Sequence, residues 1–257
     1  MPSDFKFAVR AHQSITHRYK FQAVNGTFET LERMKQICRV LNAEVLHLQV
    51  PSSLKLNETS INNLRSLLSS VSLQTLRLAL EIREVRSSQL PSELLKTMQD
   101  YSIVHCTDLS KGEMPAYESD ILYTRLFGRG KHNVYQPTDG ELSEIDNRAS
   151  GGKSEKIVMS FHFVKMYKDA ARLKTYKQTG KFPMITRSTG LASLGEVLGE
   201  DARFPSTKQE LIRSQGWKIL DLTETERIHV GDLLEKLPEG SYNNLGEVAG
   251  RLKPMMR

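Results

Sequence analysis

Hydrophobic positions follow two different periods along roughly the first 185 residues of the chain. Some segments alternate apolar and polar residues or are short and apolar, as β-strands are, whereas others space apolar residues three and four positions apart, as amphipathic helices do. Leu31, Met34 and Cys38, for example, have the helical spacing. We expect strands at residues 5–11, 45–50, 76–82, 103–107, 121–127 and 157–163, and helices at residues 27–41, 61–71, 91–101 and 139–148 and directly after the last strand.

Strands and helices that alternate in this way are typical of parallel βαβ units, so we predict an α/β fold. An eight-stranded β/α barrel takes about 250 residues, and only six strands are expected here, within about 185 residues. Either the sheet is open, or it is a TIM-type β/α barrel lacking its first strands. Because the sequence begins directly with a strand, we expect the missing strands to be those at the N-terminal end of the barrel.

The pattern changes after a polar segment that runs from Pro183 to Leu191. We expect an incomplete barrel over residues 1–185, a linker over 186–203 and a small, mostly helical module over 204–257. In that module, the spacing of Thr207 and Glu210 fits a capping box that opens a helix to about residue 213. Thr223 and Glu226 have the same spacing and predict a second capping box, ahead of a helix that ends near Leu237. We also expect an extended segment at residues 217–222 and a short helix at residues 245–252.

The composition is that of a globular protein, with 39% hydrophobic and 26% charged residues. No apolar stretch approaches the roughly 20 residues that a membrane span needs. The N-terminal sequence has no apolar segment behind a basic start, so it does not resemble a signal peptide. We therefore expect a cytoplasmic protein with no membrane partner, in which Cys38 and Cys106 are buried thiols rather than a disulfide.

The net charge of +6 is concentrated in one stretch after the last expected strand. Between Lys165 and Arg187 there are seven basic residues and one acid, Asp169. On a helix, Lys165, Lys168 and Arg172 would share one side. Such a stretch attracts phosphate groups, and nucleic acid or another phosphate-bearing ligand is one interpretation. The other interpretation is a helix face that is merely solvated.

Polar residues at the carboxyl ends of the expected strands are the best candidates for function, because ligands of parallel α/β proteins bind there. Glu81 and Arg83 share one side of their strand, opposite Leu78 and Leu80, which suit packing against helices. Buried charges need partners. The pair therefore belongs to a functional pocket or to a structural ion-pair network, and both interpretations stay open. The other candidates at strand ends are His17, Gln49, Asp108, Arg125, Gly128, Arg129 and His162.

Motifs for specific chemistry are absent from the sequence. His17, Glu81, Asp108 and His162 are suitable ligand types for a divalent metal, but no zinc-binding motif groups them, and single histidines are more often surface or core residues. There is no nucleophile elbow and no nucleotide-binding glycine fingerprint. The run from Gly128 to Lys131 is the best phosphate-binding candidate, and a basic surface turn explains it equally well.

Several short motifs follow one another in a fixed order along the chain: residues 5–11, Ile15-Thr16-His17, Gln49-Val50-Pro51, Glu81-Ile82-Arg83, Asp108 and residues 123–129. This ordered set resembles the YecE-like family, which is domain of unknown function 72. The resemblance covers about residues 4–185 and implies a TIM-type barrel with these polar residues around its mouth. It also implies a likeness in shape to metal-dependent AP endonucleases, and hence a surface that faces nucleic acid.

The chain departs from that family at several positions. The glycine-rich first strand and the second strand with a glutamate are missing, so the chain resembles a member that starts at the third barrel strand. Phe127 replaces a histidine, and His162 and Phe163 replace an asparagine pair. The resemblance therefore implies a shortened barrel or one completed by a partner protein or a second copy. Residues 204–252 also resemble a helical module, domain of unknown function 2795.

Two functions follow as hypotheses. In the first, the barrel binds nucleic acid or another phosphate-bearing ligand and hydrolyses it. Glu81, Asp108 and His17 would be catalytic, with a divalent metal as the one cofactor considered. Phosphate would be bound by the backbone of Gly128 and by the cations Arg83, Arg125, Arg129, Lys165, Lys168 and Arg172. In the second, the protein is a non-catalytic scaffold that docks a partner through its C-terminal helices.

Overall fold

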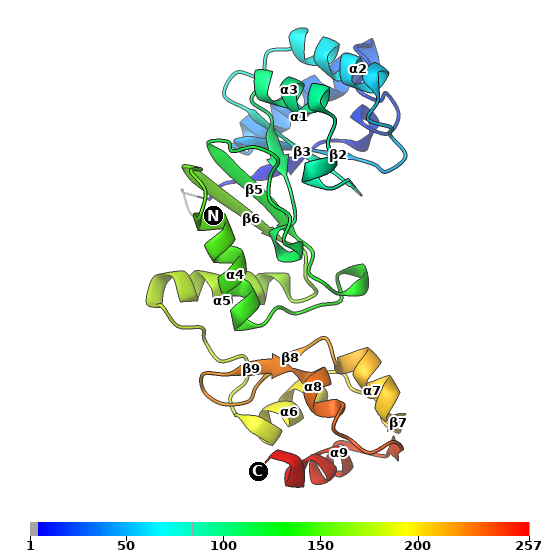
Figure 1. Cartoon of the computed structure of the whole chain (residues 1–257), viewed down its shortest axis with the longest axis vertical. Coiled ribbons are helices and arrows are strands. Elements are labelled where there is room, and N and C mark those ends of the chain that lie inside the picture. Colours follow the sequence, from blue (N-terminus) through cyan, green and yellow to red (C-terminus); the bar gives the residue numbers. More distant parts are fainter. Residues whose placement is uncertain (1–4, 84, 257) are drawn as a thin grey trace. The chain divides into compact units, whose positions relative to one another are not determined.

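The computed structural model describes residues 5–83 and 85–256 (Figure 1). The chain forms two compact units. Unit 1 comprises Met1–Arg125 and Arg148–Ser160, and unit 2 comprises Leu126–Asn147 and Phe161–Arg257.

A parallel sheet forms the centre of unit 1. Its strands follow the order of the chain: β1 (Ala8–Arg10), β2 (Val45–Val50), β3 (Arg77–Ile82) and β4 (Val104–Cys106). All three strand pairs are parallel. A parallel bridge between Thr107 and Thr124 continues the order to β5 (Ile121–Leu126), which pairs with β6 (Lys156–Phe161).

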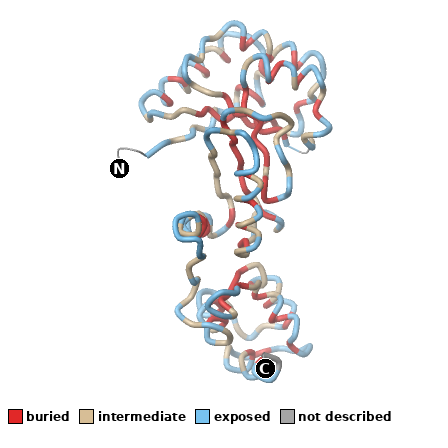
Figure 2. The backbone as a smooth tube through the Cα atoms, turned by 60° about the vertical axis from the view of Figure 1, so that its left-hand side comes forward, coloured by how far each residue is buried: buried red, intermediate tan, exposed pale blue. Residues whose placement is uncertain are grey.

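Three helices cover one face of this sheet: α1 (Asn25–Val40), α2 (Glu58–Ser69) and α3 (Ser92–Asp100). The face that they cover carries Leu46, Leu48, Leu78 and Leu80, which pack into one core with apolar residues of the helices. Figure 2 shows buried residues along the strands and at intervals along the helices, as the two apolar periods require. The opposite face of the sheet is the inner face, and it carries the polar residues described below.

The predicted α/β class with a parallel sheet is confirmed. Within the described residues the strands form a four-stranded sheet and a separate β5–β6 pair, and no pairing joins β6 to β1. The described strands therefore leave the sheet open between β6 and β1 and do not form a closed barrel.

Unit 2 contains short helices and two short strand pairs. The helices are α4 (Asp139–Ser150, which begins in this unit), α5 (Met166–Thr179), α6 (Gly190–Gly199), α7 (Lys208–Gln215), α8 (Val230–Leu234) and α9 (Leu245–Leu252). Strand β7 (Ser206–Thr207) pairs with β10 (Ser241–Tyr242), and β8 (Ile219–Asp221) pairs with β9 (Arg227–His229). No helix in the described part of the chain is long and apolar enough to cross a membrane.

Two features of unit 2 differ from the expectation. The segment expected as a linker contains helix α6, whose Leu194, Val197 and Leu198 are buried in the core of the unit. The second expected capping box is a hairpin turn, in which the Thr223 hydroxyl accepts a hydrogen bond from the Glu226 amide between β8 and β9. The same spacing of residues suits a helix start and a tight turn, and strand pairing decides between them here.

The first capping box is confirmed. The Thr207 hydroxyl accepts a hydrogen bond from the Glu210 amide at 3.2 Å, and the Glu210 carboxylate accepts one from the Thr207 amide at 2.8 Å. We expect Thr207→Ala to lower the free energy of unfolding of unit 2 by about 1 kcal/mol. Urea unfolding followed by the fluorescence of Trp217, the one tryptophan of the chain, measures this. Thr225→Ala, at an exposed position of the hairpin turn, is the matched control, and equal losses in both variants would contradict the role of the cap.

Candidate functional site

The inner face of the sheet in unit 1 holds a row of polar side chains. The register places Gln49 of β2 beside Glu81 of β3, and Glu81 beside Cys106 of β4. His47 lies two residues before Gln49 and therefore has the same orientation. We call His47, Gln49, Glu81, Cys106 and Arg125 the Glu81 cluster. An apolar layer lies next to it on the same face, formed by Val45, Ala79, Val104, Ile121 and Tyr123.

Glu81 is the centre of this cluster. It is buried, and its carboxylate forms an ion pair with Arg125 of β5. Nε2 of His47 lies 3.0 Å from Oε2 of Glu81. On the other oxygen, Oε1, Glu81 accepts hydrogen bonds from Arg83 Nε at 3.2 Å and from Gln49 Nε2 at 3.4 Å. Four side chains thus converge on one carboxylate.

These contacts determine the protonation states in the cluster. Burial raises the pKa of the Glu81 carboxyl, but His47 and Arg125 outweigh burial and lower that pKa to about 2. Burial lowers the pKa of His47, and burial raises the pKa of the Cys106 thiol. At neutral pH the cluster therefore contains an ionised carboxylate, a neutral imidazole and a protonated thiol.

Positive charge exceeds negative charge on this face. Arg10 of β1 pairs in register with His47, and its charge is near enough to contribute to the lowered pKa of that histidine. Arg10 is exposed and Arg83 is half-exposed, whereas Arg125 is buried. Two guanidinium groups thus contact the carboxylate of Glu81, and a third, that of Arg10, lies beside the neighbouring His47.

Asp108 lies close to this cluster, because its charge contributes to the raised pKa of Cys106. Its side chain caps the short helix Leu109–Lys111 by accepting a hydrogen bond from the Ser110 amide at 3.0 Å. The Lys111 ammonium lies 3.8 Å from the other carboxylate oxygen. These contacts account for Asp108 as a structural cap, and its expected catalytic role stays a prediction.

His17 lies on the segment after β1 and is exposed. Its Nδ1 contacts the Thr16 hydroxyl at 2.9 Å and the carbonyl oxygen of Gln13 at 3.2 Å. Among the described residues, no hydrogen bond or ion pair links it to the Glu81 cluster. The structure therefore does not bring it together with Glu81 through direct contacts.

Gly128 and Arg129 have packing roles in unit 2. Gly128 has a positive φ of 78°, and a Cβ there would lie 2.8 Å from the Tyr135 ring. Arg129 lies 3.5 Å from Glu141 and 4.0 Å from Glu144, so its charge is balanced. The glycine is required by backbone conformation and close packing, and phosphate binding by this turn stays a prediction.

The basic stretch does not form one exposed face. Arg172 is buried, so it does not share an exposed surface with Lys168, and its predicted role in phosphate binding stays a prediction. Its guanidinium donates to Asp169 at 2.8 Å and to the carbonyl oxygen of Pro137 at 3.1 Å. Lys165 pairs with Glu200 at 2.6 Å, while Lys168 is exposed.

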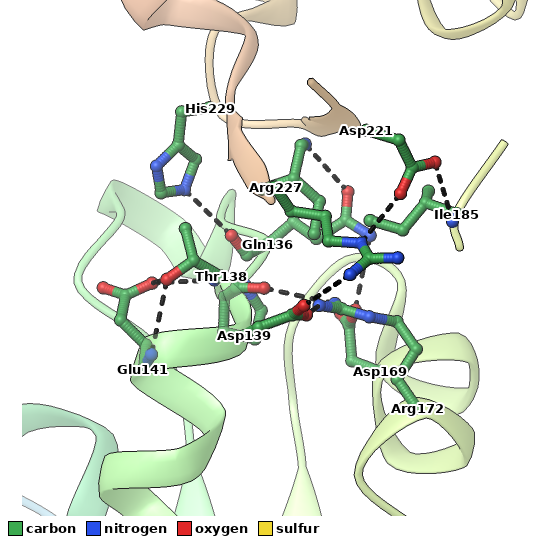
Figure 3. A network of polar contacts seen from close by, with 12 residues as sticks. Gln136, Thr138, Asp139, Glu141, Asp169, Arg172, Ile185, Asp221, Arg227 and His229 are labelled. Carbon is green, nitrogen blue, oxygen red and sulfur yellow. Dashed lines mark hydrogen bonds and ion pairs between the residues drawn. The ribbon is translucent and has the colours of Figure 1, made fainter. Parts of the chain in front are cut away.

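Arg172 belongs to a buried ion network shown in Figure 3. Asp139 of α4 pairs with both Arg172 of α5 and Arg227 of β9, the latter at 3.1 Å. Arg227 also donates to Asp221 of β8 at 2.8 Å. Each buried charge thus has a partner of opposite sign, and the network connects three parts of unit 2.

Sequence reasoning missed His47 and Arg10 and assigned Cys106 to the core. His47 and Gln49 alternate along one strand, as Glu81 and Arg83 do, which is the signal that identifies a shared face. Cross-strand register was needed to place Arg10 beside His47 and Cys106 beside Glu81.

Comparison with known proteins identifies the family of this chain. A family model described as "Protein of unknown function DUF72" matches residues 1–181. The chain belongs to the DUF72 family. No curated protein matches the chain. The narrower YecE-like assignment and the likeness of the C-terminal residues to domain of unknown function 2795 stay predictions.

Solved structures of DUF72 proteins share the fold. A DUF72 family protein from Thermotoga maritima is 18% identical, with 69% of this chain and 75% of that chain covered at a TM-score of 0.51. One from Enterococcus faecalis is 14% identical, with 69% of this chain and 80% of that chain covered at a TM-score of 0.54. At these identities the likeness concerns the fold alone.

Replacing Glu81 tests the centre of the cluster. We expect Glu81→Gln to lower the free energy of unfolding of unit 1 by about 3 kcal/mol at pH 7, because the buried ion pair between Glu81 and Arg125 would be lost. The folded-state pKa of Glu81 is lowered, so its contribution is full above the unfolded pKa of about 4.3 and is lost as the pH falls towards about 2. Urea unfolding by circular dichroism at pH 7, 5 and 3 measures both effects.

The matched control for Glu81 is Glu93→Gln. Glu93 lies 3.6 Å from Arg65 in an exposed ion pair, for which we expect a change below about 0.5 kcal/mol. A Glu81→Gln protein as stable as the parent at pH 7 would contradict the ion-pair account.

Replacing Arg172 separates a structural role from a surface role. We expect Arg172→Gln to lower the free energy of unfolding of unit 2 by about 3 kcal/mol, because Asp139 and Asp169 would lose a buried partner. Lys174→Gln, at an exposed position of the same helix, should change the free energy of unfolding of unit 2 by less than about 0.5 kcal/mol. Trp217 fluorescence during urea unfolding gives both values. Equal stability of the two variants would show that Arg172 is not a structural residue.

Proposed function

We propose that this DUF72 protein binds a phosphate-bearing ligand, either nucleic acid or a smaller phosphate compound, at the carboxyl ends of the strands in unit 1. The observation that supports this proposal is that Arg83 and Arg125 both contact the carboxylate of Glu81, with Arg10 in register beside the neighbouring His47. Guanidinium groups pair with phosphate through two parallel hydrogen bonds, and a rigid group of them is well suited to an anion. The proposal takes the sheet as part of a TIM-type arrangement, in which ligands bind at this end.

A surface cavity beside Arg83 supports the same proposal. It has a volume of about 300 Å³ and lies where β2 and β3 end. Lys55 and Arg83 contribute positive charge to its lining, and Leu54, Leu56 and Val85 contribute apolar surface. This combination favours a ligand with an apolar or aromatic part next to its phosphate, as a nucleotide has.

The contacts of Glu81 favour binding over hydrolysis. Its carboxylate is ionised and already accepts from Arg83, Arg125 and Gln49, so it is a poor proton donor near neutral pH. We therefore propose that Glu81 positions the arginines. Hydrolysis by Glu81, Asp108 and His17 is the narrower hypothesis and has less support from the geometry. Phosphate binding by Lys165 and Lys168, which lie in unit 2, is a separate hypothesis.

The test is binding of fluorescently labelled single-stranded and duplex DNA, measured by anisotropy over a range of salt concentrations. We expect the affinity of the parent protein to fall steeply with salt, because phosphate contacts release counterions. Arg10→Gln and Arg83→Gln should each weaken binding about tenfold and reduce the salt slope by about 1. Arg65→Gln, at a partly exposed position of α2, is the control that should leave both quantities unchanged.

Inorganic phosphate and a mononucleotide, added as competitors, distinguish a small ligand from nucleic acid. Competition at micromolar concentrations would indicate a small phosphate compound. No salt-dependent binding of DNA together with no binding of either small compound would contradict the proposal and favour the scaffold hypothesis.

A further inference from the structure

Three potential metal ligands converge on the inner face of the sheet. A nitrogen of His47, a carboxylate oxygen of Glu81 and the sulfur of Cys106 all lie within 4.8 Å of one another. They come from the adjacent strands β2, β3 and β4, with Glu81 and Cys106 in direct register. The exposed fractions of the three residues are 2%, 7% and 2%. Neighbouring strands of a packed sheet therefore hold all three groups in place.

The polar atoms of this group are incompletely satisfied. Nε2 of His47 lies 3.0 Å from the Glu81 carboxylate, but it has no properly aligned hydrogen-bond partner among the described residues. Oε1 of the buried Gln49 also has no partner there. Buried polar atoms are nearly always hydrogen-bonded, so unsatisfied atoms of this kind need an explanation. A bound cation next to His47 and Glu81 provides one.

The donor set determines which cation fits. One imidazole nitrogen, one carboxylate oxygen and one thiolate sulfur suit Zn²⁺, whose bonds to these atoms are about 2.0–2.3 Å long. Magnesium and calcium prefer oxygen ligands only, so the sulfur excludes them. Ligand atoms around a tetrahedral ion with such bonds lie roughly 3.5 Å apart, so binding requires the three groups to approach one another from separations of up to 4.8 Å.

We propose that His47, Glu81 and Cys106 form a binding site for a thiophilic divalent cation of the Zn²⁺ type, with a fourth coordination position left open. Binding converts the Cys106 thiol into a metal-bound thiolate and releases one proton to solvent. Glu81 is already ionised, and its two oxygens have lone pairs for four partners, so the contact with Arg125 can persist. Of the metal ligands considered from the sequence, only Glu81 is part of this site.

The two negative charges of the ligands balance the cation. Arg125 then remains as one positive charge beside the site. The metal proposal shares Glu81 with the phosphate proposal, but it can be tested separately because His47 and Cys106 carry no part of phosphate binding.

The test is a titration of the reduced, chelator-treated full chain with Co²⁺, a spectroscopic substitute for Zn²⁺. We expect one Co²⁺ per chain, a thiolate-to-cobalt charge-transfer band in the near ultraviolet and the intense visible bands of four-coordinate cobalt. Zn²⁺ should displace Co²⁺ and raise the melting temperature of the protein, because a ligand of the folded state stabilises it.

Two variants and a matched control assign the ligands. Cys106→Ser should abolish the charge-transfer band, whereas Cys38→Ser should keep it, since Cys38 is the other buried free cysteine and lies on α1. His47→Gln should weaken the binding of Co²⁺ at least tenfold. If Cys106→Ser does not fold, the His47→Gln variant tests the assignment of the ligands. Absence of the band in the parent protein, or its persistence in Cys106→Ser, would overturn the proposal.

The phosphate and metal proposals fail separately in these experiments. Arg10→Gln and Arg83→Gln should leave the cobalt spectrum unchanged while they weaken DNA binding. Loss of the cobalt band in either arginine variant would contradict the assignment of ligands.

Discussion

The inner face of this sheet is organised by one requirement, which is that the buried carboxylate of Glu81 must have partners. An ionised carboxylate out of water is costly unless positive or hydrogen-bonding groups surround it. Three groups meet this requirement: Arg125 of β5, Gln49 of β2, and Arg83, which directly follows β3. The cluster thereby brings cations to the carboxyl ends of the strands, where ligands of parallel α/β proteins bind.

Much of the fold was predictable because local patterns and tertiary packing agree. Strand Val45–Val50 and helix Leu245–Leu252 have the expected bounds, and the capping box at Thr207 opens a helix as expected. Prediction was wrong where a local pattern suits two structures. Thr223 and Glu226 have helix-capping spacing, yet pairing of β8 with β9 makes that segment a hairpin turn.

The candidate site was predictable only in part, because its partners lie far apart in the sequence. Alternation along one strand was enough to place Glu81 and Arg83 on the inner face. Arg125 lies 44 residues from Glu81, and no local pattern links them. Arg172 shows the same limit in unit 2, because its burial depends on Asp139, which lies 33 residues away in the sequence. A run of lysines and arginines thus predicts charge but not exposure.

The account depends most on the coupling between Glu81 and Arg125, and a double-mutant cycle measures that coupling directly. The unfolding free energies of the parent, Glu81→Gln, Arg125→Met and the double variant would be measured by circular dichroism at pH 7. The account predicts that the double variant is more stable than the sum of the single effects implies, with a coupling energy of about 2 kcal/mol. Additive effects of the two replacements would contradict the central role of this ion pair.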